Sequence, residues 1–137
     1  MTDFSTAEVG AALPEVVFGP VTRTTLALYA GASGDHNPIH VDIDFARKAG
    51  LDDVFAHGML SMAEFARVVT DWAGLERLVS LSTRFLAITP VGATVTCRGE
   101  VVERFESDGV PHLRVSLAAE IGEGTRSLAG EAVVRAA

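Results

Sequence analysis

The sequence predicts a single α+β domain in which antiparallel strands fold onto one long helix. The first observation is an almost uninterrupted apolar stretch, residues 58–73, which Gly74 ends. The second is a change of hydrophobic period to two, which begins at Leu75 and continues to Arg135. Helices followed by a run of antiparallel strands are typical of α+β domains. A length of 137 residues suits one hydrophobic core, so we expect one domain over residues 1–137.

The chain before the long helix has weaker patterns. Residues 1–12 carry little periodicity, and we expect them to lie over the surface. Residues 14–22 are rich in apolar and β-branched side chains, which predicts a strand. Thr22 is a candidate N-cap for a short amphipathic helix, because its hydroxyl can accept a hydrogen bond from a first-turn amide. Gly31 and Gly34 are expected to end that helix.

A second short helix is expected over residues 45–49. Asp42 and Asp44 are both candidates for its N-cap. Residues 34–40 lie between the two short helices and contain Pro38. Proline lacks an amide donor and disfavours helical angles at the residue before it, so this segment should be a tight, irregular loop.

The long helix carries a narrow polar stripe. Glu64, Arg67 and Asp71 are spaced by three and four residues, so they share one face and can pair. Almost every other position is small or apolar, and the simplest role for Met59 and Met62 is to fill the core. A helix with so little polar surface is expected to be mostly buried.

Four alternating segments follow the long helix, and turn residues separate them. Ser107-Asp108-Gly109 is a strong hairpin signal, because aspartate and glycine tolerate the positive φ of a tight turn. Alternate residues from Leu113 to Ile121 are apolar, so that face is expected to be buried, with His112 in solvent. The four expected strands are Val79–Ala87, Thr94–Glu106, His112–Ile121 and Thr125–Arg135.

Composition excludes several classes of function. The formal net charge is −7 and no run of Lys or Arg is present, which argues against nucleic-acid binding. The uncharged run 85–97 falls well short of the ~20 apolar residues of a membrane span, so no membrane partner is expected. One cysteine, Cys97, cannot form a disulfide within the chain. No apolar run follows the N-terminus as in a secretory signal, and a cytoplasmic location is expected.

The segment 34–40 (G-D-H-N-P-I-H) concentrates groups that can transfer protons. In a loop bent at Pro38, the side chains of Asp35 and His40 can turn towards one point. A carboxylate accepts a proton, and an imidazole accepts or donates one near neutral pH. We therefore expect Asp35 and His40 to act as an acid–base pair. A second stretch, residues 56–62 (A-H-G-M-L-S-M), begins the long helix.

These two stretches, together with Y-A-G-A-S at residues 29–33, resemble the MaoC-like family of (R)-specific enoyl-CoA hydratases and 3-hydroxyacyl-thioester dehydratases. The resemblance implies a hot-dog fold, in which an antiparallel sheet wraps around one long central helix. It implies an acyl thioester substrate, carried on coenzyme A or on acyl carrier protein, and no cofactor. It also implies pairing, either as a homodimer or as a heterodimer with a related chain.

The same resemblance assigns roles within the site. Asp35 and His40 would hold one water molecule, which supplies both a hydroxyl and a proton to the double bond. Gly58 would be the oxyanion donor, because first-turn amides of a helix lack partners and glycine lets an oxygen approach closely. Asn37 would fix the loop by side-chain hydrogen bonds and contact substrate. One departure is Ala66, where some members carry serine.

Two other functions stay open. A thioesterase on the same fold would use a carboxylate on the long helix, for which Glu64 is the candidate. Alternatively, the chain is the catalytic half of a two-chain dehydratase. A metal site is not expected, since the i, i+4 spacing of His36 and His40 counts only on a helix, and Pro38 breaks that geometry. His57 is expected only to shape the start of the long helix.

Overall fold

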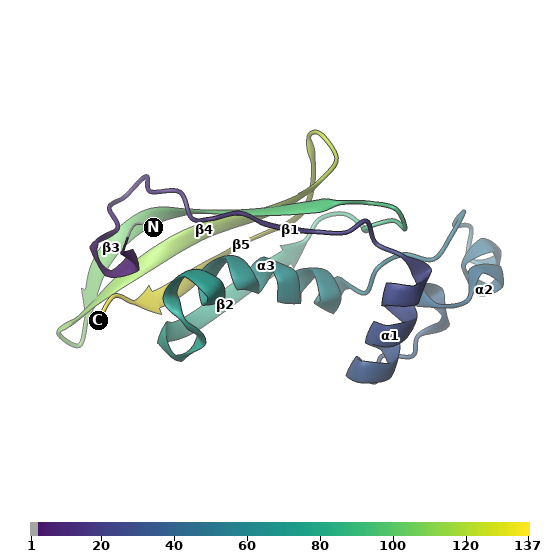
Figure 1. Cartoon of the computed structure of the whole chain (residues 1–137), viewed down its shortest axis with the longest axis horizontal. Helices are drawn as coiled ribbons and strands as arrows, with labels where there is room; N and C mark the ends of the chain where they lie inside the picture. Colours follow the sequence, from purple (N-terminus) through teal and green to yellow (C-terminus); the bar gives the residue numbers. More distant parts are fainter. Residues whose placement is uncertain (1–2) are drawn as a thin grey trace.

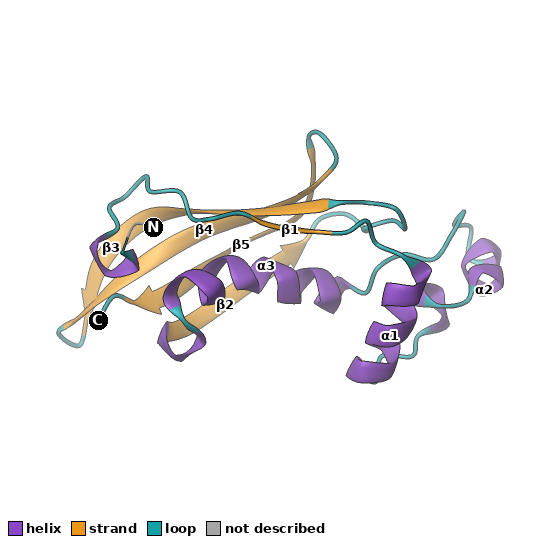
Figure 2. Cartoon of the chain, viewed as in Figure 1, coloured by secondary structure: helices purple, strands orange, loops and turns teal. Residues whose placement is uncertain are grey.

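The computed structural model describes residues 3–137, which form a five-stranded antiparallel sheet around one long helix (Figure 1). The strands, in the spatial order β1-β3-β4-β5-β2, are β1 (Val16–Phe18), β2 (Leu78–Phe85), β3 (Val95–Ser107), β4 (Val110–Ile121) and β5 (Thr125–Arg135). The helices are α1 (Arg23–Ser33), α2 (Ile43–Lys48) and α3 (Gly58–Ala73), with short 3₁₀ helices η1 (Phe4–Thr6), η2 (Pro38–His40) and η3 (Leu75–Arg77). Figure 2 shows α3 against the sheet, whereas α1 and α2 lie beyond its end.

The main core lies between α3 and the inner face of the sheet. Phe65, Val68 and Val69 of α3 are fully buried there. A β carbon at Gly99 of β3 would lie 3.0 Å from the side chains of Val68 and Leu117, so glycine lets α3 approach the sheet closely. The strand residues of this core are Val95, Cys97, Val101, Leu113, Val115, Leu117, Ala119, Leu128, Ala132 and Val134. A curved sheet holding one central helix is the hot-dog fold, and the α+β prediction is confirmed.

The strands after α3 agree with their predicted spans to within two residues at each end. Strand β5 has the predicted bounds. Strand β4 begins at Val110, earlier than predicted, because only Asp108 and Gly109 form the turn, with φ of 52° and 75°. These positive angles explain why the hairpin signal in the sequence was strong: few residues other than glycine, asparagine and aspartate adopt them readily.

The predicted strand over residues 14–22 is much shorter in the structure. Only Val16–Phe18 pair, with β3, at one edge of the sheet. Thr22 caps α1 as predicted, and its Oγ1 accepts a hydrogen bond from the Thr25 amide at 3.1 Å. Gly31 does not end α1 but lies inside it; Gly34, with a left-handed φ of 78°, is the residue that ends it.

The N-terminal segment is more closely packed than predicted. Residues 1–2 lie outside the described part of the chain. Ala7 is fully buried, and the ring of Phe4 meets Trp72 of α3 edge to face, with centroids 6.0 Å apart. Scattered apolar residues of this kind have no period, so residues 3–12 could not be placed from pattern alone.

Helix α3 has the predicted bounds but not the predicted burial. It presents one face to the sheet, and Met59 on another face is 56% exposed. The reason is geometric, since one curved sheet covers only part of a helix surface. Of the two candidate caps for α2, Asp42 is the one used; its Oδ1 accepts from the amides of Asp44 and Phe45.

His112 is buried rather than solvated, with 8% of its surface exposed. Its Nδ1 lies 2.7 Å from the carbonyl oxygen of Val110, and its ring stacks on Phe105 with centroids 5.3 Å apart. The backbone carbonyl satisfies the ring nitrogen, which lets a polar residue occupy a buried position.

The α1–α2 region has a small core of its own beyond the end of the sheet (Figure 1). Its buried residues are Val21, Leu26, Ala46, Val54 and Ala56. An ion pair between Arg23 and Asp53 links α1 to the segment before α3. None of the helices within residues 3–137 has the length and apolar character needed to cross a membrane.

Candidate active site

The loop after α1 is held by its own polar side chains. The Asn37 amide donates to Asp35 Oδ1 at 3.3 Å, and the Ile39 amide donates to Asn37 Oδ1 at 3.1 Å. Asn37 thereby caps η2, in which Pro38 takes the first position where no amide is needed. The predicted irregular loop therefore contains one 3₁₀ turn, which carries His40 back towards the body of the protein.

His40 is fixed by the segment that leads into α3. Its Nδ1 lies 2.8 Å from the carbonyl oxygen of Phe55, and its ring meets the Phe55 ring edge to face at 5.0 Å. A carbonyl only accepts, so Nδ1 carries the proton, and Nε2 of the neutral ring keeps a free lone pair. His40 is 8% exposed. This tautomer leaves Nε2 available to take a proton.

His57 lies against His40 and was not predicted to belong to the site. The two imidazoles stack with centroids 4.0 Å apart and an interplanar angle of 28°. His57 Nε2 lies 3.1 Å from the backbone carbonyl oxygen of Asp35 and donates to it. Within the described chain its buried Nδ1 has no hydrogen-bond partner. In the sequence, His57 belongs to the stretch A-H-G-M-L-S-M that carries the family resemblance, but it was expected only to shape the start of the long helix.

Asp35, His40 and His57 therefore converge. One potential ligand atom from each lies within 4.8 Å of the other two. Asp35 is exposed in the single chain, whereas both histidines are buried. These residue types can also bind metals, so the absence of a metal stays a prediction from the sequence. A carboxylate beside an imidazole with a free nitrogen can hold a water molecule and move its protons.

Gly58 opens α3 directly after His57 and faces a cavity of about 330 Å³. The walls are mostly apolar, from Phe55, Ala56, Phe85, Leu86, Ala87, Ile88 and Leu128, with polar groups at Ser61 and Thr89. A β carbon on Gly58 would lie 3.0 Å from the Phe85 ring. Neither Asp35 nor His40 lines this cavity; Phe55, whose carbonyl holds His40, and His57, which precedes Gly58, connect the two parts.

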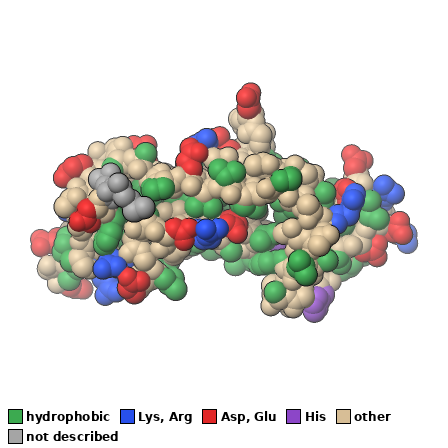
Figure 3. Space-filling view, viewed as in Figure 1, with side chains coloured by type: hydrophobic (Ala, Val, Ile, Leu, Met, Phe, Trp, Pro, Cys, Tyr) green, Lys and Arg blue, Asp and Glu red, His purple; other side chains and the backbone are tan. Residues whose placement is uncertain are grey.

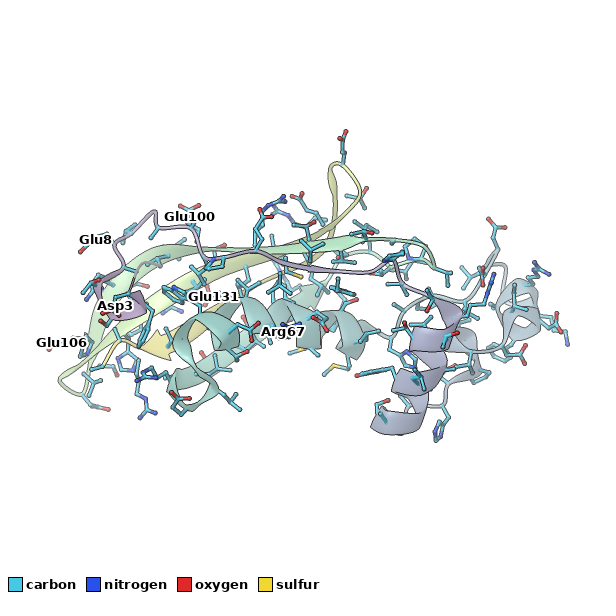
Figure 4. The ribbon with its side chains drawn as sticks, in the orientation of Figure 1. Asp3, Glu8, Arg67, Glu100, Glu106 and Glu131 are labelled. Atoms are coloured by element: carbon cyan, nitrogen blue, oxygen red, sulfur yellow. The ribbon has the colours of Figure 1, made fainter. Side chains whose placement is uncertain are left out.

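The remaining titratable candidates lie outside this cluster. Glu64 pairs with Arg67 at 2.9 Å, and Arg67 also pairs with Asp71 at 3.0 Å, so the predicted polar stripe is confirmed (Figure 4 labels Arg67 on α3). Burial, with a contribution from Glu64, raises the pKa of the Cys97 thiol to about 12, which makes this cysteine a poor nucleophile.

The pKa of His57 should be visible in the pH dependence of stability. Burial, and to a lesser extent the neighbouring His40, lowers this pKa below its ordinary value of 6.5. Between the lowered pKa and 6.5 the unfolded chain binds more protons, so the free energy of unfolding decreases as the pH falls. We expect urea unfolding from pH 7 to pH 5 to show a steeper loss of stability in the wild type than in His57→Phe. Equal slopes would contradict the lowered pKa.

The fold places the protein among the hot-dog proteins, and sequence comparison gives the family. The profile described as "MaoC like domain" matches residues 6–120. The chain belongs to this family. It is 28% identical to 3-hydroxyacyl-thioester dehydratase Z of Mycobacterium tuberculosis over 143 aligned positions, covering 96% of this chain and 95% of that protein.

Other similarities are partial or structural. The chain is 41% identical over 61 residues to fatty acid synthase subunit beta of Saccharomyces cerevisiae, but the match covers only 3% of that protein. Among solved structures, R-hydratase PhaJ1 from Pseudomonas aeruginosa superposes with a TM-score of 0.83 at 27% identity, covering 96% of this chain and 83% of that one. The ChsH1-ChsH2 complex from Mycobacterium tuberculosis gives a TM-score of 0.80 at 27% identity, covering 95% and 98%.

Proposed function

We propose that this protein hydrates trans-2-enoyl thioesters to (R)-3-hydroxyacyl thioesters, or catalyses the reverse dehydration. The observation that carries the proposal is the convergence of Asp35 and His40 next to the helix that begins at Gly58. Relatives named as a 3-hydroxyacyl-thioester dehydratase and as an (R)-specific enoyl-CoA hydratase support the same reaction. The substrate is an acyl thioester of coenzyme A or acyl carrier protein.

In the proposed mechanism one water molecule lies between the carboxylate of Asp35 and Nε2 of His40. As the water oxygen bonds to Cβ, the pair takes one of its protons and returns a proton to Cα. The electrons of the double bond move towards the thioester carbonyl, whose oxygen gains negative charge. The first-turn amide at Gly58 donates to that oxygen, supported by the positive end of the α3 dipole. The cavity beside Gly58 would take the acyl chain.

The test is an assay of the purified chain with 2-enoyl-CoA substrates of increasing acyl length, in which loss of the conjugated double bond is followed by absorbance. Thiol release from saturated acyl-CoA is measured in parallel, because it reports thioesterase activity. We expect hydration without thiol release, and Glu64→Gln should leave hydration within about threefold, since Glu64 pairs with Arg67 outside the cluster. If the wild type releases thiol and Glu64→Gln abolishes this release, the result would refute the proposed hydratase activity and support a thioesterase that uses Glu64.

We further propose that the chain forms a homodimer through β2. This strand is an edge of the sheet, and unpaired edges favour association. Exposed apolar side chains lie in β2 and directly after it, namely Val79, Phe85, Leu86 and Ile88. Figure 3 shows hydrophobic side chains gathered where α3 begins, the region that contains the exposed Met59. A second copy of the chain at this edge would cover the exposed apolar side chains of β2 and the hydrophobic region at the start of α3.

A charge on the β2 edge should therefore weaken the dimer. Val79→Lys, at a position 54% exposed, is expected to raise the dissociation constant at least about tenfold, because the ammonium would have to be desolvated at the interface. Val17→Lys is the matched control, since Val17 is 58% exposed on β1, the opposite edge. Sedimentation equilibrium measures both. A wild-type chain that is monomeric alone would favour the heterodimer with a related chain, and equal weakening by both variants would refute the β2 interface.

A further inference from the structure

We propose that His57 is a positioning residue that keeps Asp35 and His40 at the relative position they need to act as an acid–base pair. The inference rests on the proposed hydration, in which Asp35 and His40 share one water molecule. Its basis is a buried imidazole that contacts the side chain of one partner and the backbone of the other. Within the loop, Asn37 links the backbone of His40 to the carboxylate of Asp35, but it does not contact the His40 ring in these hydrogen bonds.

Three contacts fix the ring of His57. One face stacks on His40, with centroids 4.0 Å apart, and Tyr29 of α1 meets the ring at 4.8 Å and 64°. The Nε2–H donates to the carbonyl oxygen of Asp35 at 3.1 Å. With 1% of its surface exposed, His57 has no room to rotate away. Its position therefore determines how far the Asp35 backbone lies from the His40 ring.

The segment that carries His57 also carries the other fixed points of the site. Phe55 supplies the carbonyl that orients His40, and Gly58 supplies the proposed oxyanion amide. The Ala56 amide donates to the carbonyl of Thr89 at 2.9 Å, which ties this segment to the chain after β2. Residues 55–58 thus connect proton transfer to charge stabilisation. The Phe55 side chain contacts only the His40 ring, whereas the His57 side chain contacts both the His40 ring and the backbone of Asp35.

A neutral His57 suits this role. Burial lowers its pKa, so the ring stays uncharged at neutral pH. An uncharged neighbour leaves His40 able to accept a proton, whereas a charged imidazole stacked at 4.0 Å would oppose it. His57 accordingly acts through His40 and Asp35 and does not transfer the proton itself.

The other reading is that His57 only fills space, and His112 provides a matched control for it. Both are buried histidines with one ring nitrogen at a backbone carbonyl and one aromatic stacking partner. His112 lies beside the β3–β4 turn, at the opposite end of the molecule from α1 and α2 (Figure 1). Substitution of either histidine should lower stability through lost packing. Only substitution of His57 should also lower kcat, because only His57 is proposed to position Asp35 and His40.

The kinetic experiment compares His57→Phe and His57→Gln with His112→Phe and His112→Gln in the hydration assay. Phenylalanine keeps the stacking but loses the N–H, and glutamine keeps a donor of similar reach. We expect His57→Phe to lower kcat by about 10- to 100-fold, with KM within about threefold, and glutamine to restore part of the loss. The His112 variants should keep wild-type kcat while losing thermal stability. A His57→Phe kcat within threefold of wild type, or an equal kcat loss in His112→Phe, would overturn the proposal.

A second readout does not depend on activity, and so separates this proposal from the hydratase assignment. The chain has four histidines, so their imidazole carbon-bound protons give a simple NMR spectrum. The His40 resonance should shift or broaden in His57→Gln and stay in place in His112→Gln, because only the first change removes its stacking partner. An unchanged His40 resonance in His57→Gln would overturn the positioning role of His57. If instead the wild type is inactive in the hydration assay but the His40 resonance shifts as expected, only the proposed hydratase activity would be refuted.

Discussion

Asp35→Asn and His40→Ala are each expected to lower the rate of enoyl-CoA hydration by ~100-fold or more. Asparagine cannot accept the water proton, and alanine removes Nε2 of His40, the nitrogen proposed to exchange it. The fold should survive in Asp35→Asn, because Asp35 is exposed and the side-chain oxygen of the new asparagine can still accept from the backbone N–H of Asn37. Circular dichroism checks the fold, and initial rates under saturating substrate check kcat.

The double variant distinguishes a shared water from two independent contributions. If Asp35 and His40 act on one molecule, removing either disables the unit, and the double variant should be no more than a few-fold slower than the worse single variant. Independent roles would give losses that multiply, by ~10,000-fold in total if each single loss is ~100-fold. A multiplied loss, or near-wild-type activity in either single variant, would contradict the proposed mechanism.

Much of the fold could be predicted because its elements have strong periods. The apolar stretch of α3 and the alternation in β4 each repeat over many residues, and Gly74 and Gly109 mark their limits with positive φ. The length of strand β1 was predicted wrongly. It pairs over three residues only, Val16–Phe18, and three residues are too few to show a hydrophobic period. The N-terminal residues likewise pack by single contacts, such as Phe4 on Trp72.

The candidate site was only partly accessible to sequence reasoning. Pro38 and the polar residues around it predicted a bent loop, and the structure brings Asp35 and His40 together. Their catalytic roles remain predictions. His57 was missed because its partners, the His40 ring and the Asp35 carbonyl, come from a segment distant in sequence. A single histidine at the start of a helix gives no pattern from which such contacts could be inferred.

A methyl group at Gly58 is expected to lower kcat by about 100-fold, because it would shield the amide proposed to bind the thioester oxygen. The same methyl would also lie 3.0 Å from the ring of Phe85, which must then move. Phe85 is 54% exposed within one chain and is not part of the buried core, so its ring can shift and Gly58→Ala should still fold. The measured loss would therefore combine two causes, a shielded amide and a displaced cavity wall.

Removing the Phe85 ring separates these causes. In a Phe85→Ala background the methyl of Gly58→Ala meets no ring, so any loss that arises from displacement of Phe85 should disappear. If the amide is the oxyanion donor, Gly58→Ala should still lower kcat by about 100-fold relative to Phe85→Ala alone. Recovery of kcat in the double variant to the level of Phe85→Ala would show that Gly58 serves only to accommodate Phe85. The oxyanion would then have to be stabilised by another donor, and the proposed coupling of Gly58 to the Asp35–His40 pair would be lost.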